Sequence, residues 1–191
     1  ARFDERCFVL KGQGRLLYGA EIAYDSLSPS RWPAVLAELK AAGMNLVGIT
    51  VPWSRHQPQP GEADLSALNE FLSLCDREGL WVQVAVGPYA GEKCSGGGVP
   101  GWVLALASPA ARTAAVEVWL KEVAAVLRAH DISQGGSVAM VMVRPLPSNP
   151  AAEAADLTRL AQMLRAEGVS APILTANLPA ARDNTAQSMA N

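Results

Sequence analysis

Acidic and histidine side chains near the ends of short apolar runs are the first candidates for chemistry in this 191-residue chain. Glu21 and Asp25 lie near the end of one such run, and His56 follows a Pro-Trp turn. Two neighbouring carboxylates could share acid/base work, and a histidine could donate a proton or a hydrogen bond. The structural alternatives are a solvated or arginine-paired carboxylate and a histidine held by backbone groups, and we favour them for all of these residues.

Aromatic side chains form the second group of candidates. Trp53, Tyr89 and Trp102 each follow a short apolar run or a glycine-rich turn, and their rings could stack on a sugar ring. The alternative is that large rings simply fill the mouth of a core. His130 stands near the end of a predicted helix, where a favourable interaction with the helix dipole is expected, and it has no catalytic partner in view.

Composition excludes several classes of function. A net charge of −2 and a pI near 5.7 give no reason to expect a nucleic acid or an anionic membrane as partner. No apolar run approaches the roughly 20 residues of a membrane-spanning helix. Cys7, Cys75 and Cys94 are odd in number and lack metal-ligand spacing, so we expect neither a disulfide framework nor a metal site, and no cofactor. No secretory signal precedes Phe8, so it is absent or already removed, and the compartment stays open.

The elements that would position these residues alternate between helices and strands. Apolar side chains at the 3.6-residue period predict helices that begin at Ser28-Pro29, Asp64, Ser108-Pro109 and Asn149-Pro150. Nearly continuous apolar runs between them predict strands covered on both faces, at Arg15 to Tyr24, Asn45 to Val51, Leu80 to Val86, Val138 to Val143 and Pro172 to Ala176. Because the later strands each follow a helix, the sheet should be parallel.

This order predicts an α/β protein, a (β/α)8 TIM-type barrel of which the chain covers roughly the first five strands. A short hairpin precedes them, built from Phe8-Val9-Leu10 around Gly12-Gln13-Gly14, and could plug the barrel floor. We expect a partial barrel over residues 1–176 and a loop or frayed tail over 177–191, because a complete barrel needs about 250 residues. The alternative is a smaller doubly wound domain, but no Gly-x-Gly-x-x-Gly follows the first strand.

Motifs at the predicted strand ends point to a family. The second strand ends in Pro52-Trp53, and the third ends in Gly87-Pro88-Tyr89 and is followed by Gly97-Gly98-Val99-Pro100-Gly101-Trp102. In this order and spacing the chain resembles the barrel of glycoside hydrolase family 35, the β-galactosidase group, from about Phe8 to Val143. The resemblance implies a retaining mechanism, with two carboxyl groups about 5 to 5.5 Å apart as acid/base and nucleophile.

The resemblance also shows what this chain lacks. In the family the fourth strand ends in an Asn-Glu pair whose Glu is the acid/base, and gap-free counting places Pro145 and Leu146 there. Leucine cannot protonate a leaving group, and losing a positioned acid typically costs about 10²- to 10⁴-fold in rate. We therefore predict no catalytic residue in this chain. The family's nucleophile would lie beyond Asn191.

Other family positions are also substituted. The family Glu after the Gly-Pro-Tyr turn corresponds to Lys93, although a slip of one residue would restore it as Glu92. Thr50 replaces a family Tyr, Gln57 a family Glu, and Ala23 a family His. The predicted substrate-binding set is Trp53, His56, Tyr89, Glu92, Lys93 and Trp102.

Three hypotheses of function follow. The first is a catalytically impaired β-galactosidase-like scaffold that binds a carbohydrate or a protein partner, completed by the remainder of the barrel. The second is an active retaining glycosidase that uses displaced carboxylates such as Glu92 or Glu21. The third is a structural or assembly module of a larger protein, because barrels host many functions. An open mouth lined by polar groups would favour sugar binding, and a collapsed one would favour a scaffold.

Overall fold

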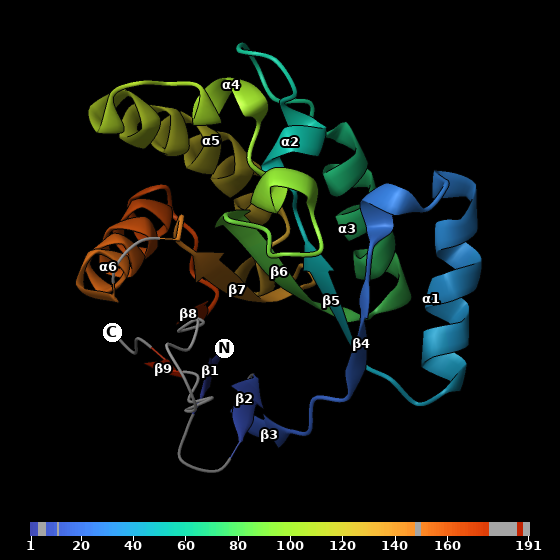
Figure 1. Ribbon diagram of the computed structural model, residues 1–191. Coiled ribbons are helices and arrows are strands. Elements are labelled where there is room, and N and C mark those ends of the chain that lie inside the picture. The colour runs from blue at the N-terminus through green and yellow to red at the C-terminus, as the bar shows by residue number, and fades with distance from the viewer. Residues whose placement is uncertain (4–6, 11, 148–149, 176–186, 189–191) are drawn as a thin grey trace.

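A curved parallel sheet with helices along its outer side forms the body of the molecule (Figure 1). The computed structural model describes residues 1–3, 7–10, 12–147, 150–175 and 187–188. The large sheet has the strand order β4-β5-β6-β7-β8-β9, and a small separate sheet has the order β1-β2-β3. Within the described ranges, no helix combines the length and apolar character needed to cross a membrane.

The predicted parallel strands are confirmed, in their sequence order. They are β4 (Gly19–Ile22), β5 (Leu46–Thr50), β6 (Trp81–Pro88), β7 (Val138–Arg144) and β8 (Ile173–Thr175). Each pairs in parallel with the next, so their carboxyl ends meet at one edge. Val82, Val84 and Val141 are fully buried, as expected for strands covered on both faces. The result is the first part of a β/α barrel.

Four helices lie where the sequence predicts them, namely α1 (Trp32–Ala41), α3 (Ser66–Glu78), α5 (Pro109–Ala129) and α6 (Pro150–Ala166). Polar side chains hydrogen-bond to backbone N–H groups at the starts of two of them. The Ser108 hydroxyl accepts a hydrogen bond from the Ala111 backbone N–H at 3.4 Å, and the Asp64 carboxylate accepts one from the Ser66 N–H at 3.0 Å. Gly79 ends α3 with a φ of 67°, a conformation that glycine adopts without strain.

The hairpin predicted near the N-terminus is present, and it is extended by one more strand. β2 (Phe8–Leu10) pairs antiparallel with both β1 (Arg2–Phe3) and β3 (Gln13–Arg15). The side chains of Phe8 and Leu10 are buried in a cluster with Ala139 and Met140 from β7. Figure 1 shows this small sheet beyond the amino ends of the barrel strands, at the predicted floor.

Sequence patterns missed several short elements. The first barrel strand is shorter than predicted. It begins at Gly19, because Arg15 pairs within the small sheet, and it ends before Tyr24, which enters a 3₁₀ turn. The strand-end motifs fold as single helical turns, α2 (Trp53–His56) and α4 (Gly101–Leu104). β9 (Gln187–Ser188) pairs antiparallel with β8. The rest of the tail predicted for 177–191 lies outside the described residues, and so does Asn149.

His130 is held at the floor end of the barrel. Its Nδ1 lies 2.5 Å from the Asp76 carboxylate and its Nε2 lies 3.0 Å from the Asn69 side-chain oxygen. The other Asp76 oxygen accepts a hydrogen bond from the Ser137 N–H, just before β7 begins. His130 therefore joins α3 to the end of α5, and it takes a structural place at the end of the sheet opposite the strand ends predicted to carry chemistry.

Candidate functional site

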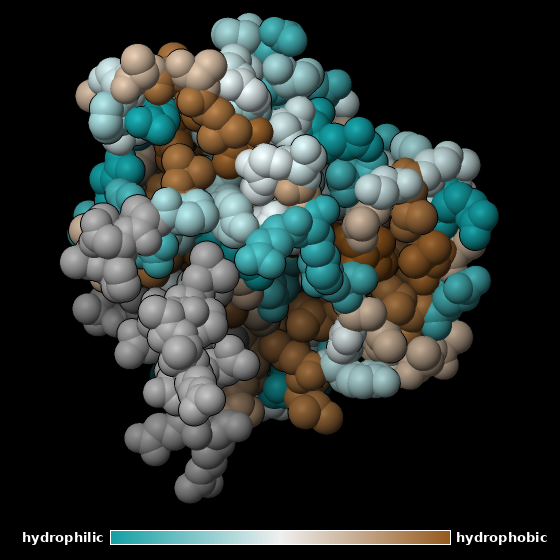
Figure 2. Space-filling model, viewed as in Figure 1, coloured by the Kyte–Doolittle hydropathy of each residue, from teal (hydrophilic) through white to brown (hydrophobic). Residues whose placement is uncertain are grey.

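A cavity of about 540 Å³ lies where the first four barrel strands end. Ligand sites of parallel barrels occupy this end, and the volume is in the ordinary range for a small-molecule pocket. Figure 2 shows hydrophilic side chains over the middle of this face, where the segment between β6 and α4 crosses the strand ends. The lining consists of Glu21, Ile22, Ala23, Asp25, Ser26, Thr50, Pro52, Tyr89, Ala90, Gly91, Glu92, Lys93, Cys94 and Arg144.

Two carboxylates from the first strand end belong to this lining. The Thr50 hydroxyl donates a hydrogen bond to Glu21 Oε1 at 3.3 Å. The Asp25 carboxylate lies 3.5 Å from Arg55 Nε, and the Arg55 guanidinium also donates to the Asp25 backbone carbonyl. Asp25 is thus the arginine-paired carboxylate that the structural interpretation expects, whereas Glu21 is exposed and has a neutral donor as its partner.

The segment after β6 brings three of the predicted substrate-binding residues to the cavity. Tyr89 is half-buried, and Glu92 and Lys93 are exposed. Gly97 gives the Tyr89 ring its space: a Cβ atom at position 97 would lie 2.4 Å from Tyr89 Cε2. Their contact with a sugar stays a prediction, but their place on the cavity wall is consistent with it.

Trp53 does not line this cavity. Its indole is fully buried and stacks on Trp119, with ring centroids 5.5 Å apart. Its Nε1 donates to Gln57 Oε1 at 2.6 Å, so the one polar atom of the ring is satisfied inside the core. The Trp102 ring packs edge-on against Trp53 and donates to the Gln57 backbone carbonyl at 3.1 Å. Trp53 and Trp102 therefore support the strand ends from outside the cavity.

His56 likewise lies in the core. Its Nε2 lies 2.6 Å from the Tyr24 hydroxyl, and its Nδ1 lies 2.7 Å from the Asp64 backbone carbonyl. Burial and the nearby charge of Asp25 both raise the pKa of Tyr24, so its phenol stays protonated. Both ring nitrogens of His56 are engaged, which matches the structural alternative and leaves no nitrogen free for a ligand.

The end of β7 differs from the gap-free expectation. The Leu146 side chain, predicted to face the mouth, instead lines a separate cavity of about 170 Å³ with Val116 from α5 and Leu160 from α6. The side chain that β7 gives to the mouth is Arg144. The physical reason is that the strand ends at Arg144, so the alternation of side chains does not extend to Leu146, which packs against the main hydrophobic core. The correspondence of Leu146 to the family acid/base stays a prediction.

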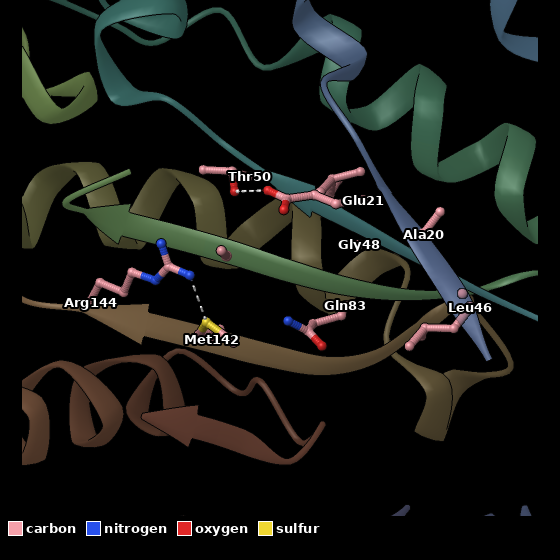
Figure 3. A pocket seen from close by; sticks show the side chains of 11 residues that line it. Ala20, Glu21, Leu46, Gly48, Thr50, Gln83, Met142 and Arg144 are labelled. Carbon is pink, nitrogen blue, oxygen red and sulfur yellow. Dashed lines mark hydrogen bonds between the residues drawn. The ribbon is translucent and has the colours of Figure 1, made fainter. Parts of the chain in front are cut away.

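A second hollow continues from the mouth along the inner face of the sheet. It has a volume of about 220 Å³ and shares Glu21, Thr50 and Arg144 with the mouth cavity. Figure 3 shows Arg144 and Met142 projecting from β7, with Gln83 on β6 farther from the strand ends. Arg144 therefore stands at the junction of both hollows. The sequence prediction did not include Arg144. Its position two residues after Met142 in the same strand nevertheless indicates that both side chains lie on the same face of the sheet.

Cys94 is the thiol on the cavity wall. Burial and the nearby charges of Asp25 and Glu21 raise its pKa, so it stays a neutral thiol at pH 7 and is a poor nucleophile. Among the residues that the structure describes, no group of three or more His, Cys, Asp or Glu side chains could hold a metal ion.

Curated relatives support the resemblance seen at the strand ends. The chain is 30% identical over 104 residues to Beta-galactosidase 11 of Arabidopsis thaliana, an alignment that covers 53% of this chain and 12% of the relative. It is 31% identical over 105 residues to Probable beta-galactosidase 2 of Dictyostelium discoideum, covering 53% and 14% respectively. The matched part thus spans only about an eighth of these relatives.

Solved structures agree on the fold. The exo-beta-1,4-mannosidase Op5Man5 from Opitutaceae bacterium strain TAV5 superposes with a TM-score of 0.73 at 21% identity, over 92% of this chain and 34% of that one. At this identity the similarity establishes a shared barrel fold and nothing finer. The model of the family described as Glycosyl hydrolases family 35 matches residues 7–189. The chain therefore belongs to glycosyl hydrolase family 35 and has a β-galactosidase-like scaffold.

Proposed function

We propose that this chain forms part of a carbohydrate-binding protein that keeps the β-galactosidase-like scaffold and hydrolyses glycosides poorly. The observation that carries the proposal is the end of β7, where an arginine takes the mouth position and no carboxylate follows it in Pro145 and Leu146. A leaving oxygen at this strand end would meet a guanidinium, which cannot be deprotonated at ordinary pH and so cannot cycle as a general acid and base.

The open mouth supports binding in preference to a purely structural role. A cavity of about 540 Å³ can enclose a sugar residue, and its wall combines the Tyr89 ring with carboxylate, hydroxyl and cationic groups. Sugar sites typically pair an aromatic face with hydrogen-bonding groups.

Isothermal titration of the complete protein that contains this chain with galactose, next to an assay of alkyl β-galactoside hydrolysis, tests the proposal. We expect saturable binding and a rate about 10²- to 10⁴-fold below that of ordinary glycosidases. Glu62→Gln, an exposed carboxylate outside the cavity, is the matched control for substitutions in the mouth. Hydrolysis at an ordinary rate, abolished by substitution within this barrel, would refute impairment, and absence of any sugar binding would refute the binding role.

A second candidate, an active retaining glycosidase with displaced carboxylates, rests on one specific observation. Glu21 and Glu92 both line the mouth cavity, and either could face a nucleophile supplied by the remainder of the barrel. This alternative predicts a bell-shaped pH profile of kcat/KM with two carboxyl-like limbs. It also predicts that Glu21→Gln or Glu92→Gln removes activity, whereas Glu62→Gln leaves it unchanged.

A further inference from the structure

The guanidinium of Arg144 lacks a counter-ion in the described part of the chain. It forms no ion pair there, and its one hydrogen-bond acceptor is the sulfur of Met142, 3.5 Å from Nη2. Its Nε is buried without any partner. Thioether sulfur is a weak acceptor, so the described residues offer the side chain of this arginine no strong hydrogen-bond acceptor. A half-buried cation left in this state is costly unless an anion joins it.

The neighbouring acids do not fill that role. Glu21 also lines both hollows, but its hydrogen-bond partner is Thr50, and no ion pair joins it to Arg144 within the described residues. Asp25 is engaged by Arg55. Glu92 is exposed, and the cation next to it in sequence, Lys93, also lines the mouth. Among the residues that the structure describes, the guanidinium of Arg144 therefore faces the two hollows and no acidic side chain pairs with it.

The backbone nearby leaves room for a ligand against this guanidinium. Gly91 stands beside it with a φ of +105°, and a Cβ atom there would lie 3.3 Å from Arg144 Nη1. A residue with a side chain at position 91 would crowd the Nη1 end of the fork. Because it is glycine, the face of the guanidinium that lies toward the mouth stays open at the junction of the two hollows.

We propose that the mouth binds an acidic sugar, a saccharide carrying a carboxylate, and that Arg144 anchors its carboxylate. The inference rests on the proposed function and names the ligand class of that same site. A carboxylate suits the planar fork of arginine because two parallel N–H···O bonds can form. A neutral sugar hydroxyl would supply an acceptor but would leave the charge of Arg144 uncompensated. Tyr89, on the same wall, offers a face for the sugar ring.

Galacturonate and galactose form the discriminating pair of probes, because they differ only in the carboxylate at C6. Isothermal titration of the full chain with each sugar should give an affinity for galacturonate that is on the order of 10- to 100-fold higher. Arg144→Met should remove that difference, and Arg144→Lys should restore only part of it because lysine lacks the fork. Arg112→Met is the matched control, a half-buried arginine that lines the separate cavity next to Leu146.

Each other outcome overturns the inference in a distinguishable way. Equal binding of galactose and galacturonate would refute the acidic-sugar assignment while supporting carbohydrate binding. Binding of acetate as tightly as galacturonate would show a simple anion site and refute the saccharide. Binding of neither sugar would contradict the proposed function as well. A circular-dichroism melt of each variant confirms that the binding results come from folded protein, and an unfolded Arg144→Met leaves Arg144→Lys to decide.

Discussion

Gly97 controls the position of the Tyr89 ring, and its substitution by alanine tests how the mouth is built. A Cβ atom at Gly97 would lie 2.4 and 2.5 Å from two ring carbons of Tyr89, closer than any packed contact allows. Gly96 has nearly the same backbone conformation, with φ of 60° against 67°, but its nearest neighbour would be a Leu104 methyl carbon at an ordinary 3.7 Å. The two alanine variants therefore share backbone strain and differ in the ring clash.

The magnitudes follow from that comparison. Alanine in a left-handed conformation costs about 1–2 kcal/mol in either variant. Gly97→Ala adds the cost of moving the Tyr89 ring, about 1–3 kcal/mol by analogy with overpacked sites. At roughly 2–4 °C per kcal/mol for a protein of this size, Gly97→Ala should melt up to about 12 °C below Gly96→Ala. Because the ring leaves the cavity wall, sugar affinity should fall about 2- to 10-fold in Gly97→Ala alone.

Thermal melts and sugar titrations of both variants measure these quantities. Equal melting temperatures and equal affinities for Gly96→Ala and Gly97→Ala would contradict the placement of Tyr89 against Gly97. A loss of affinity that is as large in Gly96→Ala as in Gly97→Ala would show that the loop as a whole, and not the ring, sets binding.

Further predictions concern stability. Asp131 is buried at 1% exposure and accepts hydrogen bonds from Ser133, Ser170 and Ala171; burial opposes ionisation, but these bonds outweigh it and lower its pKa. Since the folded pKa lies below the unfolded value near 3.8, its contribution is full above about pH 4 and is lost as the pH falls through the folded pKa. Asp131→Asn should lower the free energy of unfolding by about 2–4 kcal/mol at pH 7 and flatten the acid limb in urea melts at pH 3 to 7. Gln57→Leu should cost about 1–3 kcal/mol in the same melts, because the buried indole N–H of Trp53 loses its acceptor; a melt unchanged from the parent in either variant would contradict the account.

Much of the barrel could be predicted because helices and buried strands leave periodic signals. Ser108-Pro109 and Asp64 mark helix starts, and the apolar runs mark the strands that the structure contains. The bounds of short elements were not predicted because their residues fit two environments. Arg15 was predicted to start the first barrel strand, but it pairs with Phe8 in the small sheet. A few residues carry too little periodicity to decide between such partners.

The site was less predictable because side-chain direction depends on tertiary packing. Trp53 and His56 were sensible sugar contacts by type, but Trp119 and Tyr24, distant in sequence, hold them inside the core. For the same reason, the sequence did not reveal that Arg144, and not Leu146, lines the mouth at the end of β7. Alternation would place the Leu146 side chain on the same side as Arg144, but the strand ends at Arg144 and Leu146 lines the cavity next to α5 and α6.

The central claim, that the β7 end supplies no general acid, is tested most directly by varying the leaving group. The dinitrophenolate of a dinitrophenyl β-galactoside leaves without protonation, whereas the alcohol of an alkyl β-galactoside leaves only if an acid protonates its oxygen. Without one, the complete protein that contains this chain should cleave the alkyl substrate slower by a further factor of about 10² to 10⁴ than an ordinary glycosidase does relative to its dinitrophenyl rate. Ordinary relative rates for both substrates, with a bell-shaped pH profile that Glu21→Gln or Glu92→Gln abolishes, would contradict the account.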